Sequence, residues 1–162
     1  MEEQKKQESS VLRDPWKALT ITSDAFKQFD AIPRKFTCEG ENIMPPLTIE
    51  EIPEEAKSLA LIIDDPDAPS KTFVHYVAWN IPLTSHIPEG ASLGTEGAND
   101  FSKHAYGGPC PPSGKHRYFF KLYALNDLLQ IPPSSTKQDL EMAMNNHIVG
   151  FGELMGVYEK KR

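Results

Sequence analysis

Two proline-rich stretches each lead into a histidine that opens an apolar run. The first, residues 64–69, reads Asp-Asp-Pro-Asp-Ala-Pro and is followed by His75, and the second, residues 107–118, carries His116 and Tyr118. Proline fixes φ and lacks an N–H group, while glycine permits positive φ, so both stretches predict stiff loops. In a strand that begins at His116, the imidazole and the Tyr118 phenol share one face. We therefore expect both loops to deliver polar rings to one site.

The chemistry that these groups predict is the binding of a small anion. Imidazole and phenol groups of His75, His116 and Tyr118 can donate hydrogen bonds to it, and backbone N–H groups of residues 108–110 can assist. The Asp65 carboxylate can orient an imidazole or accept a cationic head group such as an ammonium.

The first stretch holds three carboxylates within four residues, which repel one another unless a cation, a hydrogen-bond network or solvent offsets them. Arg117 points away from His116 in the expected strand, so it can pair with an Asp of this loop. We expect Asp67 and Arg117 to form a structural brace between the two loops. The bonds before Pro66 and Pro69 are candidates for cis peptides in a tight turn.

Other kinds of site remain open at this point. His75, His116 and Asp65 could form a two-His-one-carboxylate metal site, although the histidines lack a short ligand spacing. Ser113 or Cys110 could act as a nucleophile beside His116, although no Gly-x-Ser-x-Gly elbow is present.

The 162-residue length suggests a single domain, which we place at residues 16–162 behind a polar tail, residues 1–15. The net charge of -6 argues against a general nucleic-acid or anionic-membrane binder. No run of about 18 apolar residues exists to span a membrane, and the N-terminus has no apolar segment of the secretory type. Cys38 and Cys110 form no Cys-x-x-Cys pair, so reduced thiols in a cytoplasmic protein are expected.

Short apolar or β-branched runs separated by proline-bearing turns predict six to eight strands and one helix. The expected strands cover residues 19–22, 47–49, 58–63, 73–81, 118–125 and 149–160. The expected helix covers residues 136–146, after a Ser-Ser-Thr N-cap signal. Residues 32–37 are expected to be extended, residues 24–30 to form a helical turn, and residues 83–106 to form a long, ligand-facing loop. The predicted fold class is mostly β, an antiparallel β-sandwich with one or two short helices.

The two motifs together resemble the phosphatidylethanolamine-binding protein family, also called Raf-kinase-inhibitor-like proteins, in its short bacterial and archaeal branch. One family signature is Asp-Pro-Asp-Ala-Pro with a following His, here Asp65 to Pro69 with His75. The other is Gly-Pro-x-Pro-Pro-x-Gly-x-His-Arg-Tyr, here Gly108 to Tyr118. Further agreement includes Cys38-Glu39-Gly40-Glu41-Asn42 and Gly97-Ala98-Asn99-Asp100-Phe101, so the resemblance runs from about residue 19 to the end.

The resemblance implies a Greek-key sandwich with an anion-accepting pocket at one end, cis prolines in the first motif, and a homodimer. The ligand-binding residues carried over by motif are Asp65, Pro69, His75, Gly108, Cys110, Pro111, His116 and Tyr118. In longer eukaryotic relatives a C-terminal helix closes the pocket, and the resemblance leads us to expect no such helix here.

The function expected from the sequence is non-enzymatic, cofactor-free binding of phosphate or a phosphorylated head group. The alternative is a hydrolase in which Asp65 and His75 or His116 act as acid and base on a phosphoester or acyl substrate. A third hypothesis is a docking module that regulates a kinase or another enzyme.

Overall fold

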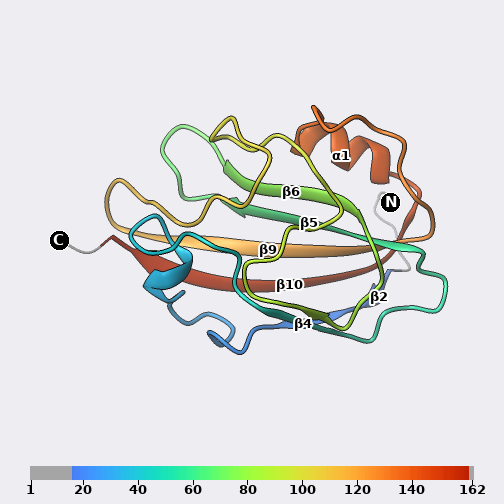
Figure 1. Ribbon diagram of the computed structural model, residues 1–162, viewed down its shortest axis with the longest axis horizontal. Coiled ribbons are helices and arrows are strands. Elements are labelled where there is room, and N and C mark those ends of the chain that lie inside the picture. The colour runs from blue at the N-terminus through green and yellow to red at the C-terminus, as the bar shows by residue number, and fades with distance from the viewer. Residues whose placement is uncertain (1–15, 161–162) are drawn as a thin grey trace, which may run out of the picture.

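Two β-sheets pack face to face in the computed structural model, which describes residues 16–160 (Figure 1). In chain order, the strands are β2 (Lys17–Ala18), β3 (Thr20–Thr22), β4 (Leu47–Glu50), β5 (Ser58–Asp65), β6 (Phe73–Ile81), β7 (His86–Ile87), β8 (Thr95–Glu96), β9 (Lys115–Leu125) and β10 (Ile148–Glu159). The larger sheet has the order β2-β10-β9-β5-β6-β8, and the smaller has the order β3-β4-β7. All pairings are antiparallel except the short one between β2 and β10. The predicted β-sandwich is confirmed.

Strand β5 lies at the centre of the larger sheet and is buried along its whole length. Leu59, Leu61 and Ile63 face the smaller sheet, whereas Ala60 and Ile62 belong to a second cluster on the opposite face. A continuous apolar run is typical of a strand covered on both sides, because the side chains on both faces are then buried. The apolar run of β5 is therefore consistent with its central position in the sheet.

The second cluster is covered by the only α-helix of residues 16–160, α1 (Lys137–Met144). Thr136 caps it: its hydroxyl accepts a hydrogen bond from the Asp139 N–H, and the Asp139 carboxylate accepts one from the Thr136 N–H. Such a reciprocal cap satisfies donors that the first turn otherwise leaves unpaired. Leu140 and Met144 then pack on the outer face of the sheet, so the predicted helix is confirmed with slightly shorter bounds.

Two local expectations are wrong. The segment expected to be extended contains the 3-10 helix η1 (Arg34–Phe36), because Pro33 holds φ at -58° and its carbonyl accepts the Phe36 N–H. The helical turn expected at residues 24–30 is absent from the structure. There the backbone bonds to the edge of β10 instead, with the Phe29 N–H donating to the Met155 carbonyl at 2.7 Å.

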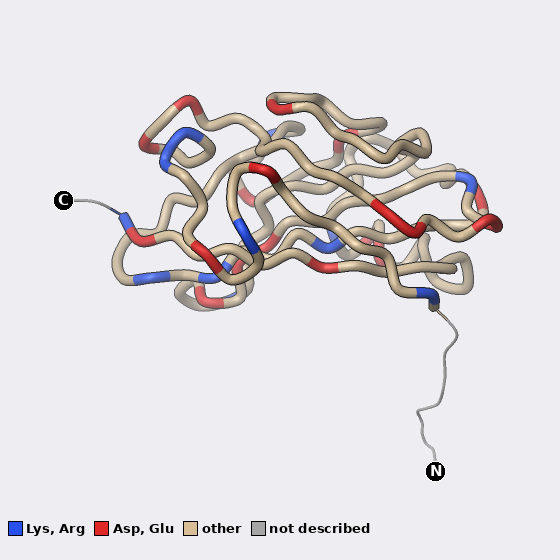
Figure 2. The backbone as a smooth tube through the Cα atoms, turned by 90° about the horizontal axis from the view of Figure 1, so that it is seen from below, with Lys and Arg blue, Asp and Glu red and all other residues tan. Residues whose placement is uncertain are grey.

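Charged residues of both signs are interspersed along the chain, as Figure 2 shows. Several Lys and Arg residues lie at the end of the molecule where the C-terminus emerges, and acidic residues lie among them. Within residues 16–160, no helix is both long enough and apolar enough to cross a membrane. The expected tail, residues 1–15, lies outside the described residues, and the single-domain assignment stays a prediction.

Candidate ligand pocket

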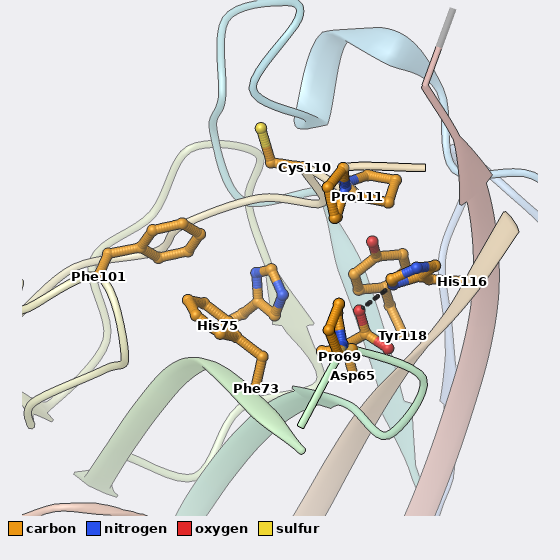
Figure 3. A pocket seen from close by; sticks show the side chains of 11 residues that line it. Asp65, Pro69, Phe73, His75, Phe101, Cys110, Pro111, His116 and Tyr118 are labelled. Carbon is orange, nitrogen blue, oxygen red and sulfur yellow. Dashed lines mark hydrogen bonds and ion pairs between the residues drawn. The ribbon is translucent and has the colours of Figure 1, made fainter. Parts of the chain in front are cut away.

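A cavity of about 390 Å³ opens at the end of the sandwich where β5 ends and β6 and β9 begin (Figure 3). Because β5 is antiparallel to both neighbours, its C-terminal end meets the N-terminal ends of both. The two proline-rich loops therefore converge here. The predicted site residues that line the cavity are Asp65, Pro69, His75, Cys110, Pro111, His116 and Tyr118.

The three carboxylates of the first loop are separated, and each contacts a different nitrogen-bearing side chain. The pairs are Asp64 with Lys121 and Lys137, Asp65 with His116, and Asp67 with Arg117. Side chains alternate along β5, and Asp64 points to the same side as Ala60 and Ile62, which lie beneath α1. Asp64 therefore lies on the outer face of the larger sheet. The repulsion expected from the sequence is thus offset by three different contacts, and only one of them lies in the cavity.

The pair inside the cavity joins Asp65 and His116. His116 Nδ1 lies 2.6 Å from Asp65 Oδ2, and the two side chains are 9% and 4% exposed. Asp65 Oδ1 also accepts the Asp67 N–H at 2.7 Å. Both carboxylate oxygens are therefore engaged, and the His116 ring is held with its Nε2 edge free of partners within the described residues.

The second imidazole, His75, is held by the other loop. Its Nδ1 lies 2.7 Å from the Gly107 carbonyl oxygen, and the residue is 3% exposed. The rings of Phe73, Phe101 and Tyr118 contact it edge-on, with centroids 5.1 to 5.3 Å away. Burial lowers the pKa of His75, and this outweighs the opposite effects of the Gly107 carbonyl and of Asp65. The neutral ring is therefore favoured.

The Tyr118 hydroxyl is buried at the cavity wall beside Asp65 and the Cys110 backbone. It has no well-formed hydrogen bond to any residue of the described chain. Burial, and then the Asp65 charge, raise the pKa of Tyr118, so the phenol is neutral at ordinary pH. A buried hydroxyl without a partner costs stability unless a ligand or water supplies one.

Asp67 and Arg117 lie at the rim of the cavity in the ion pair that the sequence predicts. Arg117 Nη2 and Nε donate to the two Asp67 carboxylate oxygens at 2.8 and 2.9 Å, and the Arg117 backbone N–H also donates to Asp67 Oδ2 at 2.9 Å. These bonds hold the pKa of Asp67 down at about 2. The contact joins the first loop to the start of β9.

The expectation of reduced thiols is wrong, because Cys38 and Cys110 form a disulfide. The segment around η1 lies against the second loop, where the Cys38 N–H donates to the Pro109 carbonyl at 3.1 Å. A disulfide sulfur cannot serve as the thiol nucleophile considered for Cys110. Ser113, the other candidate nucleophile, is exposed and is not among the residues that line the cavity.

Gly108 does not line the cavity, and its backbone N–H is used elsewhere. That N–H donates to Asn42 Oδ1 at 2.8 Å, and a Cβ at this position would lie 2.2 Å from the Phe36 carbonyl oxygen. Pro109 has no N–H group to offer. Of the backbone donors expected at residues 108–110, only the Cys110 N–H is left near the cavity, and Gly108 instead permits the close approach of two loops.

Both proline bonds of the first motif are trans, as are all peptide bonds of the described residues, so the expected cis prolines are absent. The turn is closed by side-chain and backbone hydrogen bonds instead. The Asp65 carboxylate accepts from the Asp67 N–H, and the Lys71 N–H donates to the Pro69 carbonyl at 2.9 Å.

Phe73 and Phe101 line the cavity although the sequence did not single them out for this role. Phe101 comes from the long loop expected to face a ligand. It is presented there by Asn99, whose Oδ1 accepts the Phe101 N–H and whose Nδ2 donates to the His75 carbonyl. The Gly-Ala-Asn-Asp-Phe motif was the signal that could have identified it.

No group of three or more His, Cys, Asp or Glu residues within residues 16–160 is arranged to hold a metal ion. The two-His-one-carboxylate alternative therefore gains no support from the geometry. With Asp65 committed to His116, the described cavity offers two imidazole edges and a phenol between aromatic and proline walls.

The family model of the phosphatidylethanolamine-binding protein matches residues 22–159, which include both motifs and every wall of the cavity. The chain belongs to the phosphatidylethanolamine-binding protein family. A UPF0098 protein of Pyrococcus abyssi is 49% identical over 150 residues, covering 86% of this chain and 84% of that protein. Two crystal structures of family members are also similar over their full length.

The first of these is a phosphatidylethanolamine-binding protein homolog from Chlamydia trachomatis, with 41% identity and a TM-score of 0.86, covering 90% of this chain and 99% of that one. The second is YbcL of Escherichia coli, with 31% identity and a TM-score of 0.81, covering 88% and 99%. Membership of the phosphatidylethanolamine-binding protein family supports a binding protein of this fold.

Proposed function

We propose that the chain binds a small phosphorylated head group in the cavity and does not turn it over. The observation that carries this proposal is the convergence of two partner-free imidazole Nε2 edges and an unpaired phenol on one walled space. Polar groups with defined directions inside a largely apolar wall are typical of small-molecule sites. In this proposal, the ligand completes hydrogen bonds that the protein leaves open.

Each polar group has a separate part in the proposed complex. Asp65 orients the His116 ring through Nδ1, so that the Nε2 edge of the ring faces the bound phosphate group. Tyr118 donates its hydroxyl, while Pro69 and Pro111 form rigid walls. Cys110 contributes to the wall as part of the disulfide.

A binding role without turnover is supported by the nature of the lining side chains. None of them is a Ser, Thr or Lys, and the one Cys is oxidised. The lining therefore lacks the Ser, Thr, Lys and thiol nucleophiles, and a turnover reaction would have to proceed through Asp65, the two histidines or Tyr118.

Calorimetric titration with phosphate and phosphoethanolamine tests the proposal. The parent should bind one equivalent, and His75→Ala should weaken binding at least about tenfold, because a buried ligand atom loses its partner. His147→Ala is the matched control, since His147 contacts Asn126 at the opposite end of β9. Equal affinity of the parent and His75→Ala would overturn the proposal.

The hydrolase alternative is favoured by one observation, the buried Asp65–His116 pair. In many hydrolases, a carboxylate orients an imidazole in the same way, and the imidazole then acts as the general base. A screen of phosphoester and acyl ester substrates discriminates between the two functions. Turnover by the parent that is lost in His116→Ala would replace the binding proposal with this one.

Docking to a kinase or another enzyme, and homodimer formation, stay predictions from the family resemblance. Lysate partners that are retained by His75→Ala would favour docking over ligand binding, and sedimentation analysis would give the oligomeric state. The cytoplasmic location also stays a prediction. Reduced cysteines no longer support the cytoplasmic location, because Cys38 and Cys110 form a disulfide. Disulfides persist mainly in oxidising compartments, with the intracellular proteins of hyperthermophiles as an exception.

A further inference from the structure

We infer that His75 accepts a hydrogen bond from the ligand, so that the pocket selects phosphate groups that carry one negative charge and one hydrogen-bond donor. This inference rests on the proposed function and specifies its ligand class. It differs from the expectation drawn from the sequence, in which both histidines donate to an anion.

The position of the proton on His75 follows from its backbone contact. A carbonyl oxygen can only accept, so the 2.7 Å contact between Nδ1 and the Gly107 oxygen requires a hydrogen on Nδ1. In a neutral imidazole, the other nitrogen then carries a lone pair. Figure 3 shows the His75 ring with one edge toward the loop of Cys110 and the other toward Tyr118 and Asp65. The lone pair of Nε2 therefore faces the cavity.

The rings and the loop that pack directly against His75 carry no charge that would stabilise a second proton. Phe73 from β6 and Phe101 from the long loop contact it with uncharged edges and faces. Tyr118 from β9 is a neutral phenol, and the second loop contributes a disulfide instead of a thiolate.

The charged groups that act on the ring come from the end of β5 and the start of β9. Asp65 already accepts hydrogen bonds on both oxygens, and His116 would repel a second imidazolium when protonated. Asp64 lies on the opposite face of the sheet between two lysines. Burial consequently dominates, and His75 presents an acceptor.

An acceptor in this position discriminates between phosphate species. A fully ionised phosphate oxygen would place its lone pairs against that of Nε2, which leaves both atoms unpaired. A monoester monoanion has a P–OH group that can donate to Nε2 while its charged oxygens face His116 and Tyr118. A simple phosphodiester has the same charge but no such donor, unless an ammonium in its head group supplies one.

The test compares methyl phosphate with dimethyl phosphate by calorimetry at about pH 5.5 and about pH 8, on either side of the second phosphate pKa of about 6. At the lower pH, methyl phosphate should bind about tenfold more tightly, which is the effect of one hydrogen bond to a buried acceptor. At the higher pH, this ratio should fall to one or below. At the lower pH both ligands carry one negative charge, so the ratio there reports the P–OH group and not the net charge.

The methyl diester of phosphoethanolamine forms a third arm. Binding as tight as that of methyl phosphate would show that an ammonium supplies the donor, and it would keep the donor requirement. Equal affinity for methyl and dimethyl phosphate at both pH values would overturn the inference and leave the proposed function intact. If no phosphate compound binds, both fail.

One variant separates the two nitrogens of His75. In His75→Asn, the amide nitrogen can still donate to Gly107, but no acceptor remains at the position of Nε2. The tenfold ratio at low pH should disappear, and this ratio is the readout whatever the absolute affinity of the variant. Nitrogen-15 NMR of the free parent gives a readout without ligand, and an Nε2-protonated His75 at either pH would overturn the inference.

Discussion

His116 Nδ1 and Asp65 Oδ2 lie 2.6 Å apart between side chains that are almost fully buried. A pair of this kind is costly to disrupt from one side, because the remaining partner stays buried without its counterpart. It also fixes which edge of the His116 ring meets the cavity. The pair thus affects both the stability of the fold around the pocket and the orientation of the imidazole that faces the ligand.

Replacement of Asp65 by Asn should therefore affect both properties. The Asn amide can still accept the Asp67 N–H, but it cannot balance a protonated His116. We expect a loss of about 3 kcal/mol in the free energy of unfolding, measured in urea, and a loss of phosphate binding. Asp64→Asn is the neighbouring control, since it changes a carboxylate on the other face and should leave phosphate affinity unchanged. Full binding by Asp65→Asn would contradict a role for the pair.

The pKa of Asp67 should depend on Arg117. In the parent, the pKa of Asp67 is depressed to about 2. The pair therefore stabilises the fold fully above the ordinary carboxyl pKa of about 3.9, and this stabilisation is lost as the pH falls through about 2. Arg117→Met should return the pKa of Asp67 toward the ordinary value, as followed by carbon-13 NMR. Arg34→Met, which removes a guanidinium that bonds to the Glu39 carbonyl, should not. An unshifted Asp67 in Arg117→Met would refute the brace.

The disulfide should stabilise the fold through the chain that it closes. Cys38 and Cys110 are separated by 72 residues, and the loop-closure entropy for that length corresponds to about 4 kcal/mol. The double variant Cys38→Ser/Cys110→Ser should lose about this much in denaturant unfolding. Dithiothreitol should lower the stability of the parent to the same level and leave the double variant unaffected. Two alkylatable thiols in the parent without reductant would exclude the disulfide.

Gly108→Ala tests the contact between the two loops beside the pocket. The added Cβ would lie 2.2 Å from a backbone oxygen of Phe36, which cannot move away as a flexible side chain would. Overpacking of this sort should cost about 1–3 kcal/mol in the free energy of unfolding. Ser113→Ala, an exposed position in the same loop, is the control and should be nearly neutral. A parent-like stability of Gly108→Ala would show that the loops can separate at little cost.

The central strands and the converging motifs could be predicted because their signals are local. A continuous apolar run gives β5, and the alternation of buried His116, Tyr118 and Phe120 with less buried neighbours gives the start of β9. Antiparallel pairing then brings the ends of these strands together without further information. The position of most site residues follows from these facts.

The features that were missed depend on contacts between distant segments. The partnership of Cys38 with Cys110 is decided by how η1 packs against the second loop, which no spacing in the sequence reveals. Phe101 reaches the cavity through hydrogen bonds of Asn99 in a loop without periodicity. The proton position on His75 depends on a single carbonyl oxygen, and Gly108 faces a backbone atom instead of a ligand.

Adjacent carboxylates at the end of β5 have their ion-pair partners on opposite faces of the sheet, because consecutive residues of a strand point to opposite sides. Asp64 contacts lysines on the helix side, whereas Asp65 contacts an imidazole on the pocket side. Changes beneath α1 should then combine additively with changes in the pocket. The helix side of the sheet is therefore the place to attach a fluorophore or a surface tether when ligand occupancy is to be recorded without altering it.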